Sequence, residues 1–158
     1  MSYQKYCDLI DEFYFQTEID DVPNRYENTN FNLLEIPVTL AYGGEDTDNL
    51  LLFCEFGELP EEGQDKALRK ILECNMELFA QNAGQFSINP ETGQVLLMVR
   101  LPLDEIEKET FVGILMMYAS MAKEWRQTYF LTERTDLEEI LNTFLLPADS
   151  KSQLTYQQ

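Results

Sequence analysis

The chain has 158 residues, enough for one domain with a sizeable core, and its 11 basic and 29 acidic residues give a net charge of −18 at pH 7. This charge repels phosphate backbones and anionic membranes, so nucleic-acid binding is not expected. No apolar run approaches the ~20 residues of a bilayer-spanning helix, and histidine, the usual proton shuttle and metal ligand at neutral pH, is absent. We therefore expect a cytosolic protein without a membrane span, a metal site or histidine-dependent catalysis.

The first element is predicted to be an amphipathic helix over about residues 3–16. Apolar side chains recur there at helical spacing, and mostly charged or amide side chains fill the opposite side. The apolar positions are Tyr3, Tyr6, Cys7, Ile10, Phe13 and Tyr14. A polar connection, residues 17–30, follows this helix.

Three apolar runs come next and predict an antiparallel meander. The runs cover residues 31–36, 38–42 and 50–56, and they are separated by Pro37 and by the turn-rich sequence GGEDTDN. Because proline has no N–H to donate, Pro37 is expected at a sheet edge or at a bend between the first two strands.

Residues 64–81 are predicted to form a second helix with two apolar stripes about 100° apart around its axis. The first stripe comprises Ala67, Ile71, Cys74 and Leu78, and the second comprises Leu68, Leu72, Met76 and Phe79. A peripheral helix in a small domain can pack only one of these stripes on its own sheet. The second stripe therefore predicts a partner subunit.

A β-hairpin is predicted over residues 85–101, with its turn in the sequence NPETG. Its second strand contains the run VLLMV, residues 95–99, which is apolar at every position instead of alternating. Val95, Leu97 and Val99 are expected to meet a helix, whereas Leu96 and Met98 need a second covering layer. Three coverings remain open: a dimer mate, the C-terminal segment or a bound partner.

A long helix is predicted to start at a capping box formed by Asp104 and Glu107 and to run to about Phe130 as the main helix across the sheet. Its apolar positions are Ile106, Phe111, Ile114, Leu115, Tyr118, Met121, Ala122, Trp125 and Tyr129.

We divide the chain into a domain of residues 1–131, an amphipathic helix within residues 132–147 and a disordered tail of residues 148–158. The C-terminal helix is predicted either to add a layer to the core or to form a lid over a groove. The predicted fold class is α+β, an antiparallel sheet with helices packed on it in the order α-β-β-β-α-β-β-α, plus the C-terminal helix.

Motifs for catalysis and metal binding fail when tested residue by residue. The acidic cluster of residues 45–49 resembles a calcium loop, but Leu50 and Leu51 occupy positions that need a ligand and a glycine. The odd set of Cys7, Cys54 and Cys74 has no CxxC spacing and is expected to be three buried thiols. Apolar surface exceeds what one core needs, which favours a binding module over an enzyme; an enzyme using carboxylates alone is the remaining alternative of another class.

Taken together, six segments resemble the class I type III secretion chaperones, the CesT (Tir chaperone) family, over residues 3–130. They are the opening helix YQKYCDLIDEF, the strand pair LLEIPVTLAY, the strand LLLFCEFGELP, the helix ILECNMELFAQNAG, the hairpin FSINPETGQVLLMVRLPL and the closing helix ending MAKEW. Two parts depart from the pattern: residues 131–158 extend beyond it, and the connection of residues 17–30 is longer and more polar.

The resemblance implies an acidic homodimer in the bacterial cytosol, without enzymatic activity or a cofactor. It implies binding to the N-terminal chaperone-binding segment of a secreted effector, which is kept soluble, extended and secretion-competent, and it makes the secretion ATPase a further candidate partner. The implied dimer interface comprises Leu68, Leu72, Met76 and Phe79. The implied effector-binding residues are Leu9, Ile10, Phe13, Phe31, Leu33, Leu96 and Met98. As an alternative function, the chain would sequester a transcriptional regulator of the secretion system.

Overall fold

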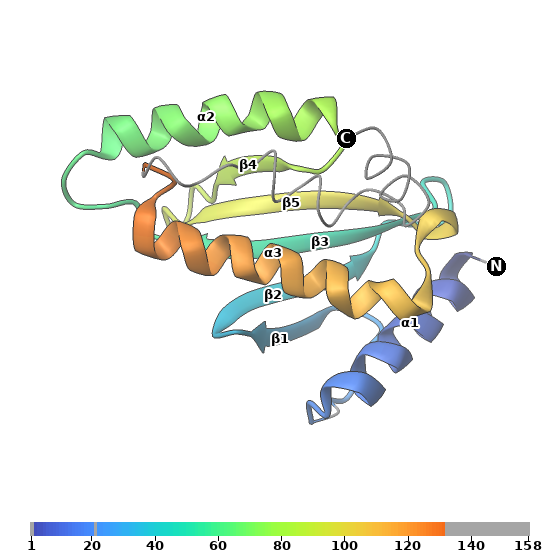
Figure 1. Cartoon of the computed structure of the whole chain (residues 1–158). Helices are drawn as coiled ribbons and strands as arrows, with labels where there is room; N and C mark the ends of the chain where they lie inside the picture. The colour runs from blue at the N-terminus through green and yellow to red at the C-terminus, as the bar shows by residue number, and fades with distance from the viewer. Residues whose placement is uncertain (1, 21, 132–158) are drawn as a thin grey trace, which may run out of the picture.

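The computed structural model describes residues 2–20 and 22–131. Within these residues, three α-helices accompany one five-stranded antiparallel sheet with the strand order β1-β2-β3-β5-β4 (Figure 1). The elements are α1 Ser2–Thr17, β1 Thr29–Leu33, β2 Ile36–Tyr42, β3 Asn49–Gly57, α2 Gln64–Ala80, β4 Gln85–Ile88, β5 Val95–Pro102 and α3 Lys108–Thr128. The predicted α+β class and the order of these elements are confirmed. The predicted C-terminal helix and tail lie outside the described residues.

α3 runs across one side of the sheet, which we call the first face (Figure 1). The Sγ of Cys54 in β3 lies 3.7 Å from the backbone oxygen of Tyr118 in α3, so Cys54 marks this face. Side chains alternate along each strand, and those on the first face are buried. They include Val38, Leu40, Leu50, Leu52, Phe56 and Phe86, together with the predicted Val95, Leu97 and Val99.

α1 covers the same face over β1 and β2. Its Phe13 ring lies 4.2 Å from the Phe31 ring of β1, and its Tyr6 ring lies 5.6 Å from the Tyr42 ring of β2. The core therefore forms between the first face and the two helices α1 and α3.

α2 runs along the edge strand β4 (Figure 1). The side-chain amide of Asn75 accepts from the Phe86 N–H at 2.7 Å and donates to the Phe86 carbonyl at 3.4 Å. This pairing satisfies backbone groups of an edge strand that would otherwise be open to another chain. The first α2 stripe, Ala67, Ile71, Cys74 and Leu78, is buried as predicted.

The predicted first strand is wrong at its C-terminal end. β1 ends at Leu33, and Leu34 and Glu35 form a two-residue turn with φ of 52° and 69° before β2 begins. Two positive φ values are typical of a type I′ hairpin turn, which usually contains Asn or Gly. Pro37 lies in β2 beside this bend, and the pairing of β2 with β3 begins only at Val38, so its missing N–H interrupts no β2–β3 pair.

The predicted capping box is also wrong. Asp104 lies in a 3-10 turn, Leu103–Glu105, and α3 begins after Glu107, which makes no side-chain capping hydrogen bond. Pro102 and the buried Leu103 set this turn between β5 and α3. The three cysteines are buried and free, as predicted.

Candidate functional site

α2 carries an exposed apolar stripe beside its buried one. Leu72, Met76 and Phe79 are 67%, 81% and 86% exposed, and Leu68 is half-buried. These are the four residues predicted for the dimer interface. Large apolar side chains at this spacing and exposure mark an interaction surface more often than ordinary surface. Their role in a dimer stays a prediction.

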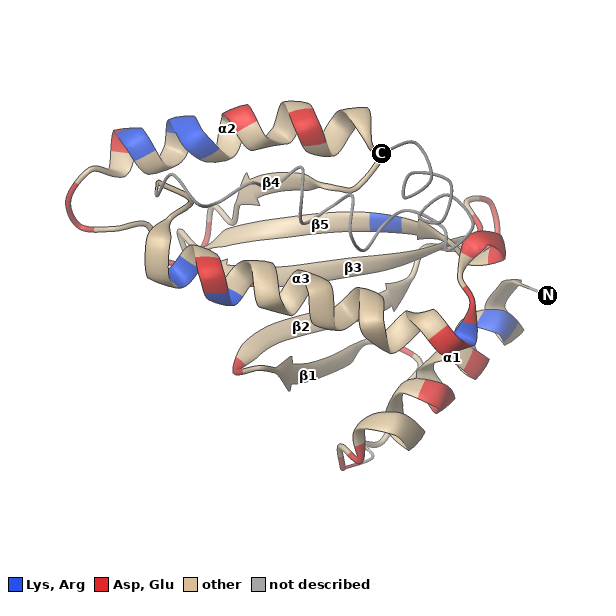
Figure 2. Cartoon of the chain, in the orientation of Figure 1, with Lys and Arg blue, Asp and Glu red and all other residues tan. Residues whose placement is uncertain are grey.

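Charges are distributed unevenly along α2 (Figure 2). The basic side chains Lys66, Arg69 and Lys70 lie in its N-terminal half, and the acidic Glu73 and Glu77 lie toward its C-terminus. Asp65 in the first turn suits the helix dipole, whereas Arg69, Lys70 and Glu73 lie in the middle of the helix, beyond the terminal turns where the dipole acts. Arg69 and Glu73 form an exposed i,i+4 pair at 3.1 Å.

The second face of the sheet, opposite α3, is apolar over β3 and β5. Phe53 pairs directly with Met98 across these strands, one residue out of phase with the buried pair Cys54 and Leu97. Because side chains alternate, Phe53 and Met98 point away from α3. The apolar residues of this face are Leu51, Phe53, Leu96 and Met98, and all four are half-buried.

The α2 stripe and the second face meet at a hollow of about 510 Å³. Phe79 of α2 lines it together with Phe53 and Met98 of the sheet, and Arg100 and Gln85 supply polar groups. Arg100 is the only basic residue in the five described strands. Phe79 thus brings one end of the stripe to the second face, and we call the stripe and the second face together the α2–sheet surface.

The seven residues predicted to bind an effector fall on two different faces. Leu96 and Met98 belong to the α2–sheet surface. Leu9, Ile10 and Phe13 are fully buried between α1 and the first face, and Phe31 and Leu33 of β1 lie beneath them, also buried. Effector binding by any of the seven stays a prediction, and binding by the five on the first face requires that α1 moves.

Leu51 and Phe53 were missed by the sequence reasoning. They belong to the run LLLFCEF, which is apolar at consecutive positions in the same way as VLLMV. Applying the same test of alternation to both runs would have found a pair of adjacent strands with two apolar faces.

The described residues were compared with the requirements of a metal site, a membrane-spanning helix and a reactive thiol. Within residues 2–20 and 22–131, no three His, Cys, Asp or Glu side chains come together in a way that could hold a metal ion. No helix in this part of the chain is long and apolar enough to cross a membrane. Burial raises the pKa of Cys54 to about 12 and that of Cys74 to about 11, so neither thiol is poised as a nucleophile.

A model of the Tir chaperone protein (CesT) family matches residues 8–126. The chain belongs to this family. The resemblance found in the sequence is thereby confirmed, and CesT-family membership makes the chain a type III secretion chaperone-family protein that binds other proteins and is not an enzyme. Among curated proteins, none matches the sequence significantly.

Solved structures share the fold of this CesT-family chain at low sequence identity. A chain of the ExsC–ExsE complex is 19% identical with a TM-score of 0.65, covering 78% of this chain and 92% of its own length. A chain of the HopA1–SchA chaperone–effector complex is 19% identical with a TM-score of 0.63, covering 80% and 97%. The Yersinia pestis type III secretion chaperone SycH, in complex with a stable fragment of YscM2, is 18% identical with a TM-score of 0.58, covering 75% and 98%.

Proposed function

We propose that this chain acts in the bacterial cytosol as a homodimeric chaperone for a secreted effector, whose N-terminal segment it binds and keeps extended and secretion-competent. The observation that carries this proposal is the α2–sheet surface, an apolar surface that no other described residues cover in a CesT-family protein with a net charge of −18. Such a surface costs free energy in water unless a partner covers it. The net charge keeps the chain soluble while that surface is free.

The α2 stripe supports a homodimer in which two α2 helices run antiparallel. A two-fold axis near Leu72 would bring the basic half of one helix beside the acidic half of the other. The basic side chains Lys66, Arg69 and Lys70 of one helix would then lie near Glu73 and Glu77 of the other, and this charge complementarity favours the antiparallel orientation. Burial of Leu72, Met76 and Phe79 in this interface would then supply the apolar contribution to the free energy of dimerisation.

The remaining apolar surface supports binding of an extended segment. At about 25 cal/mol per Å², removing a few hundred Å² of apolar surface from water contributes several kcal/mol before ordering costs. β1 is an edge strand that pairs only with β2 among the described strands, so a client strand could add to its open side. The acidic surface favours a client with basic residues. In the HopA1–SchA complex, a chaperone with this fold is bound to an effector.

Co-expression with secreted-protein genes encoded nearby, followed by purification, tests the proposal. We expect one such protein, or its N-terminal segment alone, to co-purify with the chain. Deletion of the gene should lower the stability and secretion of that client. A change in transcription of secretion genes without loss of any client would instead support sequestration of a transcriptional regulator.

A further inference from the structure

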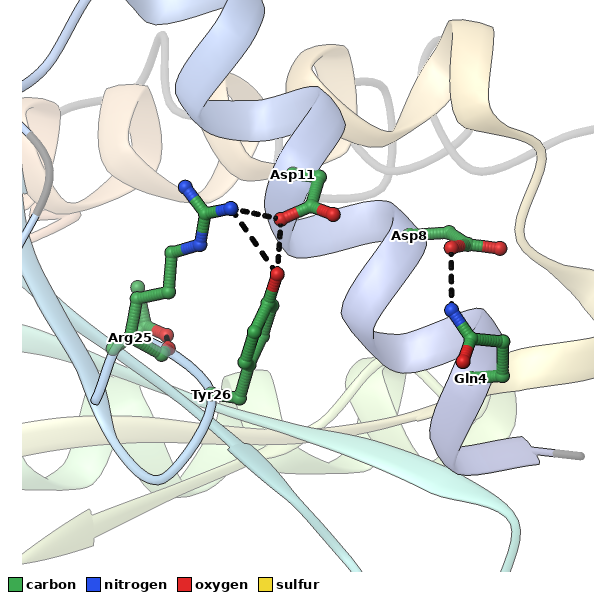
Figure 3. Close-up of polar contacts among 6 residues, drawn as sticks. Gln4, Asp8, Asp11, Arg25 and Tyr26 are labelled. Atoms are coloured by element: carbon green, nitrogen blue, oxygen red, sulfur yellow. Dashed lines mark hydrogen bonds and ion pairs between the residues drawn. The ribbon is translucent and has the colours of Figure 1, made fainter. Parts of the chain in front are cut away.

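The connection between α1 and β1 is fastened to α1 by a polar cluster of Asp11, Arg25 and Tyr26 (Figure 3). The Asp11 carboxylate accepts from Arg25 Nη2 at 2.7 Å and from the Tyr26 hydroxyl at 2.6 Å. Arg25 also donates to the Tyr26 hydroxyl at 3.1 Å. One carboxylate of α1 therefore holds two side chains of the connection.

Arg25 is further held by aromatic rings and by the start of β1. Its guanidinium lies 5.6 Å from the ring centroid of Tyr14 in α1 and 5.1 Å from that of Tyr26. The Thr29 hydroxyl donates to the backbone carbonyl of Arg25, which ties the connection to the first residue of β1. The cluster thus links α1 to the edge of the sheet.

Arg25 has a second role besides its ion pair with Asp11, because the segments on both sides of it are acidic. In the sequence, α1 carries Asp8, Asp11 and Glu12 against a single lysine. The connection carries four acidic residues, Glu18, Asp20, Asp21 and Glu27, with Arg25 as its only basic residue. Without Arg25, two acidic segments would face each other. With side-chain exposures of 27% for Arg25 and 46% for Asp11, the pair is only partly shielded from solvent, so its own contribution to the stability of the closed α1 is modest.

The layer between α1 and β1 contains the five buried residues predicted for effector binding: Leu9, Ile10 and Phe13 on α1, and Phe31 and Leu33 on β1. We propose that the Asp11–Arg25–Tyr26 cluster controls access to this layer: while intact it keeps α1 closed over β1, and its opening exposes the layer to the effector segment. The claim that opening exposes this layer to an effector segment rests on the proposed function. The claim that the cluster controls α1 opening rests only on the contacts of the cluster.

The thiol of Cys7 reports the opening directly, because it is buried on α1, whereas Cys54 and Cys74 are buried under α3 and in α2. Native protein is labelled with a thiol reagent, and the rate at each cysteine is measured by mass spectrometry. In Asp11→Asn and Arg25→Gln, we expect Cys7 labelling to be roughly three- to tenfold faster, with Cys54 and Cys74 unchanged. Tyr26→Phe, which removes only the hydroxyl, should give a smaller increase.

Asp8→Asn is the matched control. It removes the same charge one turn earlier, and its partner Gln4, at 3.0 Å, belongs to the same helix, so no link to another element is lost (Figure 3). Its Cys7 rate should equal that of the wild type. Equal Cys7 rates in Asp11→Asn and Asp8→Asn would overturn the inference, as would equal acceleration of all three cysteines, which indicates global destabilisation.

A second measurement separates this inference from the proposed function. If closed α1 limits binding, the affinity of the purified effector segment should rise in Asp11→Asn in proportion to the Cys7 rate and stay unchanged in Asp8→Asn. Unchanged affinity with faster Cys7 labelling would refute control of access while leaving the chaperone function intact. Failure of every variant, and of the wild type, to bind any client segment would refute the proposed function and leave the labelling result standing.

Discussion

Phe53 and Met98 are direct cross-strand partners on β3 and β5, and both side chains point away from α3. Their neighbours Cys54 and Leu97 form the adjacent pair and point into the core. Two adjacent strands therefore carry apolar residues on both faces, although the described helices α1 and α3 cover only one. This relationship leaves Phe53 and Met98 half-buried on a face that α1 and α3 do not cover.

The two faces should respond differently to truncation of neighbouring leucines. Leu97→Ala removes a fully buried side chain from the first face and should lower the free energy of unfolding by about 2–5 kcal/mol. Leu96→Ala, one residue earlier in the same strand, should lower it by less than about 1 kcal/mol, because the side chain is half-buried on the second face. Urea unfolding of both variants measures the difference, and equal losses would contradict the assignment of faces.

Charged residues in the α2 stripe should abolish the proposed homodimer without unfolding the chain. Leu72→Glu combined with Phe79→Glu alters only exposed positions, and the buried stripe of the same helix stays intact. We expect a folded monomer in sedimentation, with an unchanged far-ultraviolet circular dichroism spectrum. Gln64→Glu, which places the same side chain at an exposed position at the start of α2 and outside the stripe, should remain dimeric. A dimer of unchanged mass in the double variant would show that another surface pairs.

Two substitutions in the turn between β1 and β2 should raise the stability of the protein. Leu34 and Glu35 both adopt positive φ, which costs non-glycine residues roughly 1–2 kcal/mol each. Replacing them by Asn-Gly, the preferred type I′ pair, should raise the free energy of unfolding by about 1–2 kcal/mol, since Leu34 is partly exposed and loses little packing. A higher urea midpoint is the expected result; a lower one would mean that Leu34 contributes contacts worth more than the backbone strain.

Stability should fall at alkaline pH because of the buried thiols. Burial raises the pKa of Cys54 from 9.0 to about 12 and that of Cys74 to about 11, so the folded state keeps protons that the unfolded state releases. The stabilisation is complete below about pH 9 and is lost as the pH rises toward 11 to 12. Urea unfolding of the wild type across this range should show the decline.

Cys54→Ala provides the comparison for this decline. The variant should be less stable at neutral pH because of the cavity, but its stability should fall less steeply above about pH 9. Identical slopes in the two proteins would assign the decline to other groups, such as Tyr6, whose pKa burial raises to about 12.

The sequence predicted the regular elements well because their signals are periodic. The helices of residues 3–16 and 64–81 and the hairpin of residues 85–101 match the structure to within about two residues. The turn at Leu34 and Glu35 was missed because neither residue signals a positive φ, which the flanking strand pairing imposes. Asp104 and Glu107 have capping-box spacing, but the 3-10 turn after Pro102 takes up the position where the helix was expected to begin.

The candidate site was predictable only in part. The second α2 stripe could be predicted because its apolar residues recur at helical spacing, as those of the first stripe do. Groove and core residues could not be separated, because Phe13 in the core and Phe79 on the surface are equally apolar in sequence and differ only in what packs on them. The Asp11–Arg25–Tyr26 cluster joins residues fourteen and fifteen positions apart through a loop geometry that no periodic pattern encodes.

Limited proteolysis of the purified complex between this chain and its client tests the chaperone function most directly. The account predicts that the client's N-terminal segment resists protease in the complex at concentrations that degrade the same segment alone, and that Leu72→Glu combined with Phe79→Glu weakens this protection. A segment cleaved as rapidly in the complex as in isolation would contradict the account.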